Sequence, residues 1–379
     1  MIRRIITVGL WAGCVLGWPG LLRGETVELK TRTLTDGAEY QSLDQMLRMT
    51  SAQRFSMQEG RTMSGDEGAD FKHLAKKEPK YLCKSPFKCV AQLGSNRYAF
   101  ALDSTNLKTK GFDRLYFDFN RNGDLTDETP IKANRDSLGA GAYSGNNQNR
   151  TFPRQELEIE AGGVKYKTSF TLSAYSNVMP NGTVQYAGAQ LNNGICREGK
   201  LTLDGKSHRL FVLDYNNNGR FDDVSGMDSN SVMTVNRDEL YLQTGDMVLI
   251  DPAAGKDMPW GYSPVDSADR QYLSKLLSVE GKYYTVKVTP SGDQITVEPA
   301  KLPMGALVNR NGPYRAVVVG KQGAIKLTGE KDKPVPVPAG EWQLMECQIN
   351  PTNVAASKPA SQPASSPAPK RKSLSDRLA

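Results

Sequence analysis

Paired runs of alternating apolar and polar residues, each pair joined by a short turn, constrain the fold of this chain more than any other feature of its sequence. Successive residues of a strand point to opposite faces, and a tight turn lets two strands pair side by side. Each pair of runs therefore predicts an antiparallel hairpin. The clearest pairs are 157–161 with 164–172, 200–203 with 208–213, and 283–289 with 294–298.

Helical patterns are scarce beside these hairpins. Two stretches, 42–49 and 267–277, place apolar residues at the i, i+3, i+4 spacing of an amphipathic helix. The 35 Gly and 21 Pro and an apolar fraction of 38% fit a turn-rich β protein that still has enough apolar residues for a core. We therefore predict a mainly β fold: a hairpin-rich sandwich or partly open barrel, followed by a small C-terminal β-sandwich-like unit.

The sequence divides by pattern into four segments. The first places two arginines before a short apolar run, which is the layout of a secretory signal peptide. The last is rich in Pro, Ala and Ser and has no apolar period, which predicts disorder. In order, the segments are a signal peptide at 1–24, a β-rich domain at 25–255, a small C-terminal β unit at 256–350 and a disordered, partly basic tail at 351–379.

The two ends carry the net charge of +7. Residues 1–24 hold three arginines and no acid, and 351–379 sum to +4, so 25–350 are neutral overall. A neutral folded region predicts no nucleic-acid partner. The signal peptide predicts export to the periplasm, the cell envelope or the extracellular space. Association with a membrane would follow only if Cys14 is lipidated or the signal stays uncleaved.

Cleavage of the signal would leave four cysteines. An even count in an oxidising compartment allows disulfides, and a bridge could close the short loop between Cys83 and Cys89. Buried thiols are the alternative, and the sequence leaves both open. The four cysteines are Cys83, Cys89, Cys196 and Cys347.

The chain has two histidines, His73 and His208, which excludes a His-rich zinc site.

Two loops carry the chemistry that stands out in this sequence. Each follows an apolar run and reads Asp-x-Asn-x-Asn-Gly, then an apolar residue two positions after the glycine, then acids. They start 96 residues apart, at Asp118 and Asp214, which suggests a diverged internal repeat. The candidate residues are Asp118, Asn120, Asn122, Asp124, Asp127 and Glu128 in the first loop, and Asp214, Asn216, Asn218, Arg220, Asp222 and Asp223 in the second.

The spacing matches the needs of a hard cation. Calcium takes six to eight oxygen ligands, and a tightly wound loop points the side chains at positions 1, 3 and 5 inward while glycine at position 6 allows the turn. These loops resemble the EF-hand-like calcium loops of exported bacterial proteins, also found in dockerin modules and thrombospondin-type repeats. The resemblance implies side-chain ligands at positions 1, 3 and 5, and the backbone carbonyls of Asp124 and Arg220 at position 7.

The loops also depart from an EF-hand. Position 12, where a bidentate acid is expected, holds Thr129 and Ser225, and the acids fall one to three positions earlier. Asparagine at positions 3 and 5 lowers the negative charge. If calcium binds, we expect weak affinity, with dissociation constants on the order of 10⁻⁴–10⁻³ M.

Plain hairpin turns are the alternative, because Asn-Gly is also a preferred turn sequence. Residues 307–312 repeat the Asn-Arg-Asn-Gly core of the first loop, but Leu307 stands where the leading Asp should be, and no acids follow. The metal interpretation therefore depends on the leading and trailing acids.

The sequence favours an exported calcium-binding protein with a structural or binding role in a bacterial cell envelope. Its partner would be an envelope polysaccharide or another envelope protein. The alternatives are a carbohydrate-active hydrolase with paired carboxylates, and a polysaccharide-binding adhesin with an aromatic platform around Trp260. No catalytic residue stands out.

Overall fold

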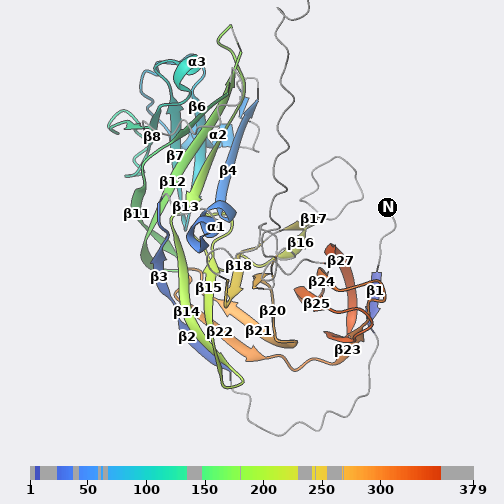
Figure 1. Ribbon diagram of the computed structural model, residues 1–379. Helices are drawn as coiled ribbons and strands as arrows, with labels where there is room; N and C mark the ends of the chain where they lie inside the picture. The colour runs from blue at the N-terminus through green and yellow to red at the C-terminus, as the bar shows by residue number, and fades with distance from the viewer. Residues whose placement is uncertain are drawn as a thin grey trace, which may run out of the picture.

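The computed structural model describes residues 5–8, 24–36, 42–58, 61–62, 67–134, 147–179, 181–228, 241–243, 245–253, 267 and 269–350. Its described part is mainly β, arranged in several sheets with few helices, and it contains no closed barrel (Figure 1). The predicted fold class is therefore confirmed. The tail 351–379, Cys14 and Trp260 lie outside the described residues, and 5–8 and Gly24 are the described part of the predicted signal peptide.

The N-terminal body is a two-layered sandwich. One layer contains β4 (Ala52–Gln58), β5 (Arg61–Thr62), β10 (Asn147–Thr151), β11 (Gln155–Ala161), β12 (Val164–Val178) and β13 (Val184–Asn193). The other contains β6 (Phe87–Leu93), β7 (Asn96–Asp103), β8 (Arg114–Phe117) and β9 (Ile131–Lys132). The strand orders are β10-β12-β13-β4-β5, with β11 also paired to β12, and β6-β7-β8-β9.

Aromatic and aliphatic side chains from both layers form the core of this sandwich. Phe100, Phe117, Phe170 and Leu191 are almost completely buried between the layers. The outer face of the β6–β9 layer is covered by helix α2 (Glu67–Leu74). The short helix α3 (Leu107–Lys110) lies near β10.

A second body continues from the sandwich. It contains β2 (Glu25–Glu28), β3 (Lys30–Thr33), β14 (Ile195–Leu203), β15 (Lys206–Leu213), β18 (Met247–Ile250), β19 (Arg270–Tyr272), β20 (Leu276–Val279), β21 (Lys282–Val288) and β22 (Gln294–Pro299). Its sheets have the orders β19-β18-β15-β14-β3 and β2-β22-β21-β20. Strands β16 (Gly226–Asp228) and β17 (Tyr241–Gln243) form a separate pair.

The C-terminal part has its own apolar core around Trp342. Its strands are β1 (Ile5–Val8), β23 (Met304–Leu307), β24 (Tyr314–Gly320), β25 (Gly323–Gly329), β26 (Val335–Pro338) and β27 (Gly340–Ile349). Their orders are β1-β27-β24-β25 and β23-β26. Strands β2 and β22 pair, as do β18 and β19, so backbone hydrogen bonds cross the boundary predicted at 255/256.

All three predicted hairpins are present, as β11–β12, β14–β15 and β21–β22. The predicted helix at 42–49 is confirmed by α1 (Leu43–Thr50), whose first turn is capped by the Ser42 hydroxyl accepting the Gln45 N–H at 3.2 Å. The described helices include none long and apolar enough to cross a membrane.

The helix predicted at 267–277 is wrong. The segment forms β19 and β20, which pair with β18 and β21. Leu273, Leu276 and Leu277 are all buried, because the chain bends between the two strands and both of them contribute to the core. Tertiary pairing thus overrides a local spacing that suits a helix equally well.

The four cysteines are thiols in the structure, and Cys89 and Cys196 are buried. The loop before β6 is held by Asp103 instead of a disulfide, since its carboxylate accepts the N–H groups of Leu82 and Cys83 at 3.0 Å. Burial, reinforced by Asp103, raises the pKa of the Cys83 thiol to about 12.

We therefore expect the native protein to be alkylated by iodoacetamide first at the exposed Cys347. Cys83 should react more slowly, because little of it is thiolate at pH 8, and Cys89 and Cys196 should react only after denaturation. Peptide mass spectrometry of the non-reduced protein would measure this. A disulfide-linked pair of peptides containing Cys83 and Cys89 would contradict it.

Candidate metal centre

The two Asp-x-Asn-x-Asn-Gly loops have the same backbone conformation. Each starts where a core strand ends, with Asp118 after β8 and Asp214 after β15. The residue at position 4 has a positive φ in both, 58° at Arg121 and 51° at Asn217. The glycines at position 6 match as well, with φ of 76° and 77°. The two loops therefore share a turn geometry, and a repeat of the longer segments around them stays a prediction.

The leading aspartates organise the loops in the same way. Asp118 accepts the N–H of Asn122 on Oδ1 (3.2 Å) and that of Gly123 on Oδ2 (3.1 Å). Asp214 accepts the corresponding groups, from Asn218 at 3.0 Å and Gly219 at 2.7 Å. Both aspartates are buried. Each loop therefore wraps around a carboxylate that uses both of its oxygens.

The asparagine side chains converge on a second carboxylate. Asn216 and Asn218 both donate from Nδ2 to Oδ2 of Asp223, at 2.9 and 2.7 Å. In the first loop, Asn122 donates to Asp127 at 2.7 Å, and Asn120 does so at 3.4 Å. Asp127 and Asp223 are therefore equivalent, and each stands nine positions after its leading aspartate.

A third carboxylate completes each loop and comes from different places in the sequence. In the first loop, Glu128 accepts the N–H of Phe119 on Oε1 at 2.9 Å. In the second, Asp246 accepts the equivalent N–H of Tyr215 on Oδ1 at 3.0 Å, and that of Asp223 on Oδ2 at 2.9 Å. Sequence reasoning missed Asp246, because it stands just before β18 and outside any local motif.

The side chains of the two residues at position 7, Arg220 and Asp124, form ion pairs instead of pointing into the loops. Arg220 binds Asp222 with two hydrogen bonds, of 3.0 and 2.8 Å. Asp124 forms an ion pair with Lys77 at 2.7 Å, and hydrogen bonding to Lys77 is the main cause that lowers the pKa of Asp124 to about 2. Their carbonyl oxygens stay candidates for position 7.

Like charges gather inside the second loop. Burial raises the pKa of Asp214 to about 8, opposed by its backbone hydrogen bonds and reinforced by the charge of Asp223. Burial, followed by the charges of Asp214 and Asp223, also raises the pKa of Asp246. Yet all four oxygens of Asp214 and Asp246 accept backbone N–H groups, an arrangement that suits ionised carboxylates. A bound cation would reconcile this geometry with burial.

The first loop repeats this electrostatic pattern in a milder form. Burial is the main cause that raises the pKa of Glu128, and the charges of Asp127 and Asp118 add to it. Among the described residues, no group of three or more His, Cys, Asp or Glu side chains is arranged to hold a metal ion. A cation would therefore also need oxygens from the asparagines and the backbone.

The third Asn-x-Asn-Gly segment, at 309–312, lacks this arrangement. Asn309 accepts the N–H of Asn311 at 3.1 Å and donates to the carbonyl of Gly312 at 2.9 Å, which makes a local turn. Leu307 belongs to β23 and supplies no carboxylate.

The second loop lies at the junction between the sandwich and the second body. The carbonyl of Asp214 accepts a hydrogen bond from the Ser51 hydroxyl, and that of Asn218 accepts the Gly94 N–H at 2.6 Å. The Tyr166 hydroxyl donates to the carbonyl of Gly219 at 2.6 Å. A Cβ at residue 219 would lie 2.4 Å from the Gly94 nitrogen, so only glycine allows this contact.

The first loop joins helix α2 to its sheet. The N–H groups of Lys76 and Lys77, just after α2, donate to the carbonyl of Gly123 at 2.7 and 3.0 Å. Leu125 is buried against Phe71 of α2. Both loops thus tie together segments that are distant in sequence.

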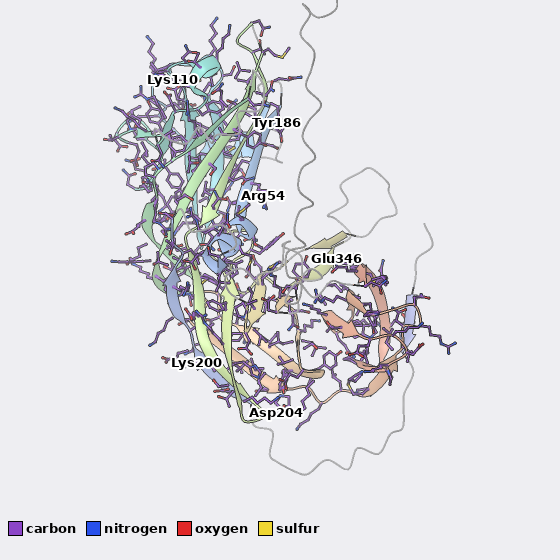
Figure 2. All side chains as sticks on the ribbon, viewed as in Figure 1. Arg54, Lys110, Tyr186, Lys200, Asp204 and Glu346 are labelled. Carbon is purple, nitrogen blue, oxygen red and sulfur yellow. The ribbon has the colours of Figure 1, made fainter. Side chains whose placement is uncertain are left out.

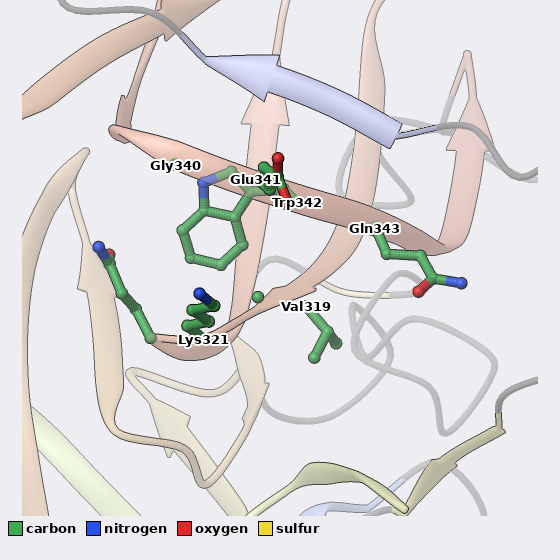
Figure 3. A pocket seen from close by; sticks show the side chains of 8 residues that line it. Val319, Lys321, Gly340, Glu341, Trp342 and Gln343 are labelled. Carbon is green, nitrogen blue, oxygen red and sulfur yellow. The ribbon is translucent and has the colours of Figure 1, made fainter. Parts of the chain in front are cut away.

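A cavity of about 510 Å³ lies elsewhere, in the C-terminal part (Figure 3). Glu341 is the one carboxylate among its described lining residues, so the cavity does not supply the carboxylate pair that a glycoside hydrolase uses. The lining residues are Val319, Gly320, Lys321, Gln322, Gly340, Glu341, Trp342 and Gln343.

Comparison with protein-family models, with curated protein sequences and with solved structures finds no match for this chain.

Proposed function

We propose that this protein is an exported, calcium-stabilised β protein of a bacterial cell envelope, in which two calcium loops lock the strands and present a structural or binding surface. The observation that carries the proposal is the repeated geometry. Two loops, 96 residues apart, share a buried leading aspartate, two converging asparagines and two further carboxylates.

The donor set suits calcium. In the second loop, Asp214, Asn216, Asn218 and Asp223 would supply side-chain oxygens, and Arg220 its carbonyl. Each asparagine carbonyl oxygen accepts one backbone N–H and keeps a second lone pair for a cation. Calcium accepts such mixed oxygen shells in flexible geometry, whereas magnesium demands a near-ideal octahedron. The corresponding donors in the first loop are Asp118, Asn120, Asn122 and Asp127, with the carbonyl of Asp124.

The position of the loops favours a structural role for the ion. A calcium ion at the second loop would offset the repulsion among Asp214, Asp223 and Asp246, at the junction of two bodies. A cation at the first would fix the segment that follows α2. At a calcium concentration ten times the dissociation constant, binding would stabilise the fold by about 1.4 kcal/mol per site. Sites of this weak class are useful where calcium is millimolar, which agrees with the signal peptide predicted at 1–24.

Thermal unfolding in millimolar calcium and in EGTA tests the proposal. We expect the melting temperature of the parent protein to be a few degrees higher in calcium, because two weak sites together contribute about 3 kcal/mol. Magnesium at the same concentration should have a smaller effect. Identical melting curves in calcium, magnesium and EGTA would refute it.

A further inference from the structure

The outer face of the sandwich layer that contains β12 and β13 has an unusual set of side chains. In its middle row, Tyr175 of β12 lies directly opposite Gly188 of β13, with Asn149 of β10 on one side and Ser56 of β4 on the other. We call the outward-facing residues of β10, β12, β13 and β4 around this row the tyrosine face. Figure 2 labels Tyr186 and Arg54, which lie along one side of the sandwich on β13 and β4.

The neighbouring rows continue the same chemistry. Asn177 and Tyr186 are opposite each other in the row beyond Tyr175, and Ser173, Gln190 and Arg54 share the row on the other side. Amides, hydroxyls and tyrosines therefore dominate these rows. Among their described side chains, Arg54 carries the one charge.

Strand β12 supplies an internal comparison. Every second residue of β12 points to the same side of the sheet as Tyr175. Towards the start of the strand, these residues include the exposed Lys165 and Lys167, which lie opposite Glu160 and Glu158 of β11. Such cross-strand pairs of opposite charge are the usual way to solvate a sheet face. Further along β12, the residues on this side of the sheet are the neutral ones of the tyrosine face. Solubility does not require this difference, whereas recognition of an uncharged polar ligand does.

The two tyrosines are held in place before any ligand arrives. Their ring centroids are 5.3 Å apart, and the Tyr175 hydroxyl donates to that of Tyr186 at 2.7 Å. A Cβ at residue 188 would lie 2.2 Å from the Tyr175 hydroxyl oxygen, so the glycine lets this ring lie across the neighbouring strand. Tyr186 keeps 45% of its surface exposed. A rigid aromatic platform of this kind loses little conformational entropy on binding.

We propose that the tyrosine face binds a neutral polysaccharide. A pyranose ring has one face of C–H groups that packs on an aromatic ring, and hydroxyls that pair with amide and hydroxyl side chains. A polysaccharide without charge needs no ion-pair partners, and the described side chains of the tyrosine face include one cation and no acid. The site goes beyond the calcium loops and does not involve their residues. Trp260, around which the sequence predicted an aromatic platform, lies outside the described residues, and the proposed site rests on Tyr175 and Tyr186 alone.

Affinity gel electrophoresis of the full chain tests this proposal. The gels would contain galactomannan, mixed-linkage β-glucan or dextran as neutral polymers, and polygalacturonate as an acidic one. We expect at least one neutral polymer to retard the parent protein. Tyr186→Ala and Tyr175→Ala should each weaken that binding by roughly tenfold or more, as expected for loss of a central aromatic contact. Gly188→Ala should also weaken it, because it displaces the Tyr175 ring.

The matched control is Lys167→Ala, which changes an exposed residue of the same strand outside the tyrosine face and should bind like the parent. Melting temperatures of all variants would show that each is folded. Repeating the gels in calcium and in EGTA separates this proposal from that of the calcium loops. Retardation of folded protein under both conditions would support the polysaccharide site even if calcium had no effect on stability. Retardation by polygalacturonate alone, by no polymer, or equally for parent and tyrosine variants would overturn the proposal.

Discussion

Replacing Asp214 by alanine is expected to lower the free energy of unfolding by about 2–4 kcal/mol in millimolar calcium. The buried N–H of Gly219 loses its acceptor at a cost of about 1–3 kcal/mol, and calcium bound at this loop contributes about 1.4 kcal/mol. The N–H of Asn218 loses one acceptor but keeps Asn216 Oδ1. The replacement should also abolish the share of the calcium response that the second loop contributes. Denaturant titrations of parent and variant, in calcium and in EGTA, would measure both effects.

The variant Asp214→Asn separates the calcium interpretation from that of a plain turn. It keeps the shape of the side chain and one acceptor but removes the charge. In EGTA at pH 7, burial raises the pKa of Asp214 to about 8 and leaves the carboxyl largely neutral, so a neutral amide changes little and we expect stability near that of the parent. In calcium, the variant should gain far less stability than the parent does.

The turn at 309–312 provides the control for these variants. Asn309→Ala removes an equivalent local turn contact in a segment without the leading acid. It should keep the full calcium response of the parent. If Asp214→Asn and Asn309→Ala respond to calcium equally, the second loop is a plain turn.

Without calcium, stability is expected to fall as the pH rises from about 4 to about 8, by up to about 1.4 kcal/mol per pH unit. Burial raises the pKa of Asp214 to about 8 in the folded protein, whereas an unfolded aspartate titrates near 3.9. Between these values, the folded state binds more protons than the unfolded state, so raising the pH favours unfolding. Chemical denaturation in EGTA across this range would measure the slope.

Calcium should flatten this dependence, because a cation near Asp214 takes the place of its proton. The parent in millimolar calcium should therefore show little loss of stability between pH 5 and pH 8. Asp214→Asn should show a shallower slope even in EGTA, since it removes the titrating group. A parent whose stability is the same across this range in EGTA would show that Asp214 stays ionised without a cation.

Much of the fold could be predicted from local patterns. The hairpins β11–β12, β14–β15 and β21–β22 and the capped helix α1 each depend on a few consecutive residues. The stretch at 267–277 shows the limit of such reasoning. Its leucine spacing fits a helix, but hydrogen bonding to β18 and β21 makes it two strands.

Part of the candidate metal site could likewise be predicted from the local sequence, and part could not. The Asp-x-Asn-x-Asn-Gly spacing by itself determined how each loop winds around its leading aspartate, because those hydrogen bonds join residues at most five positions apart. It also included Asp127, Glu128 and Asp223 among the candidates.

Only the tertiary structure decided the rest. Asp246 reaches the second loop from 32 residues further along the chain, and the tyrosine face exists because β10, β12, β13 and β4 pair in one register. A local motif predicts only the contacts between residues that are a few positions apart in the chain. The charge around a buried carboxylate and the composition of a sheet face depend on which distant strands become neighbours, and that is set by packing of the whole core.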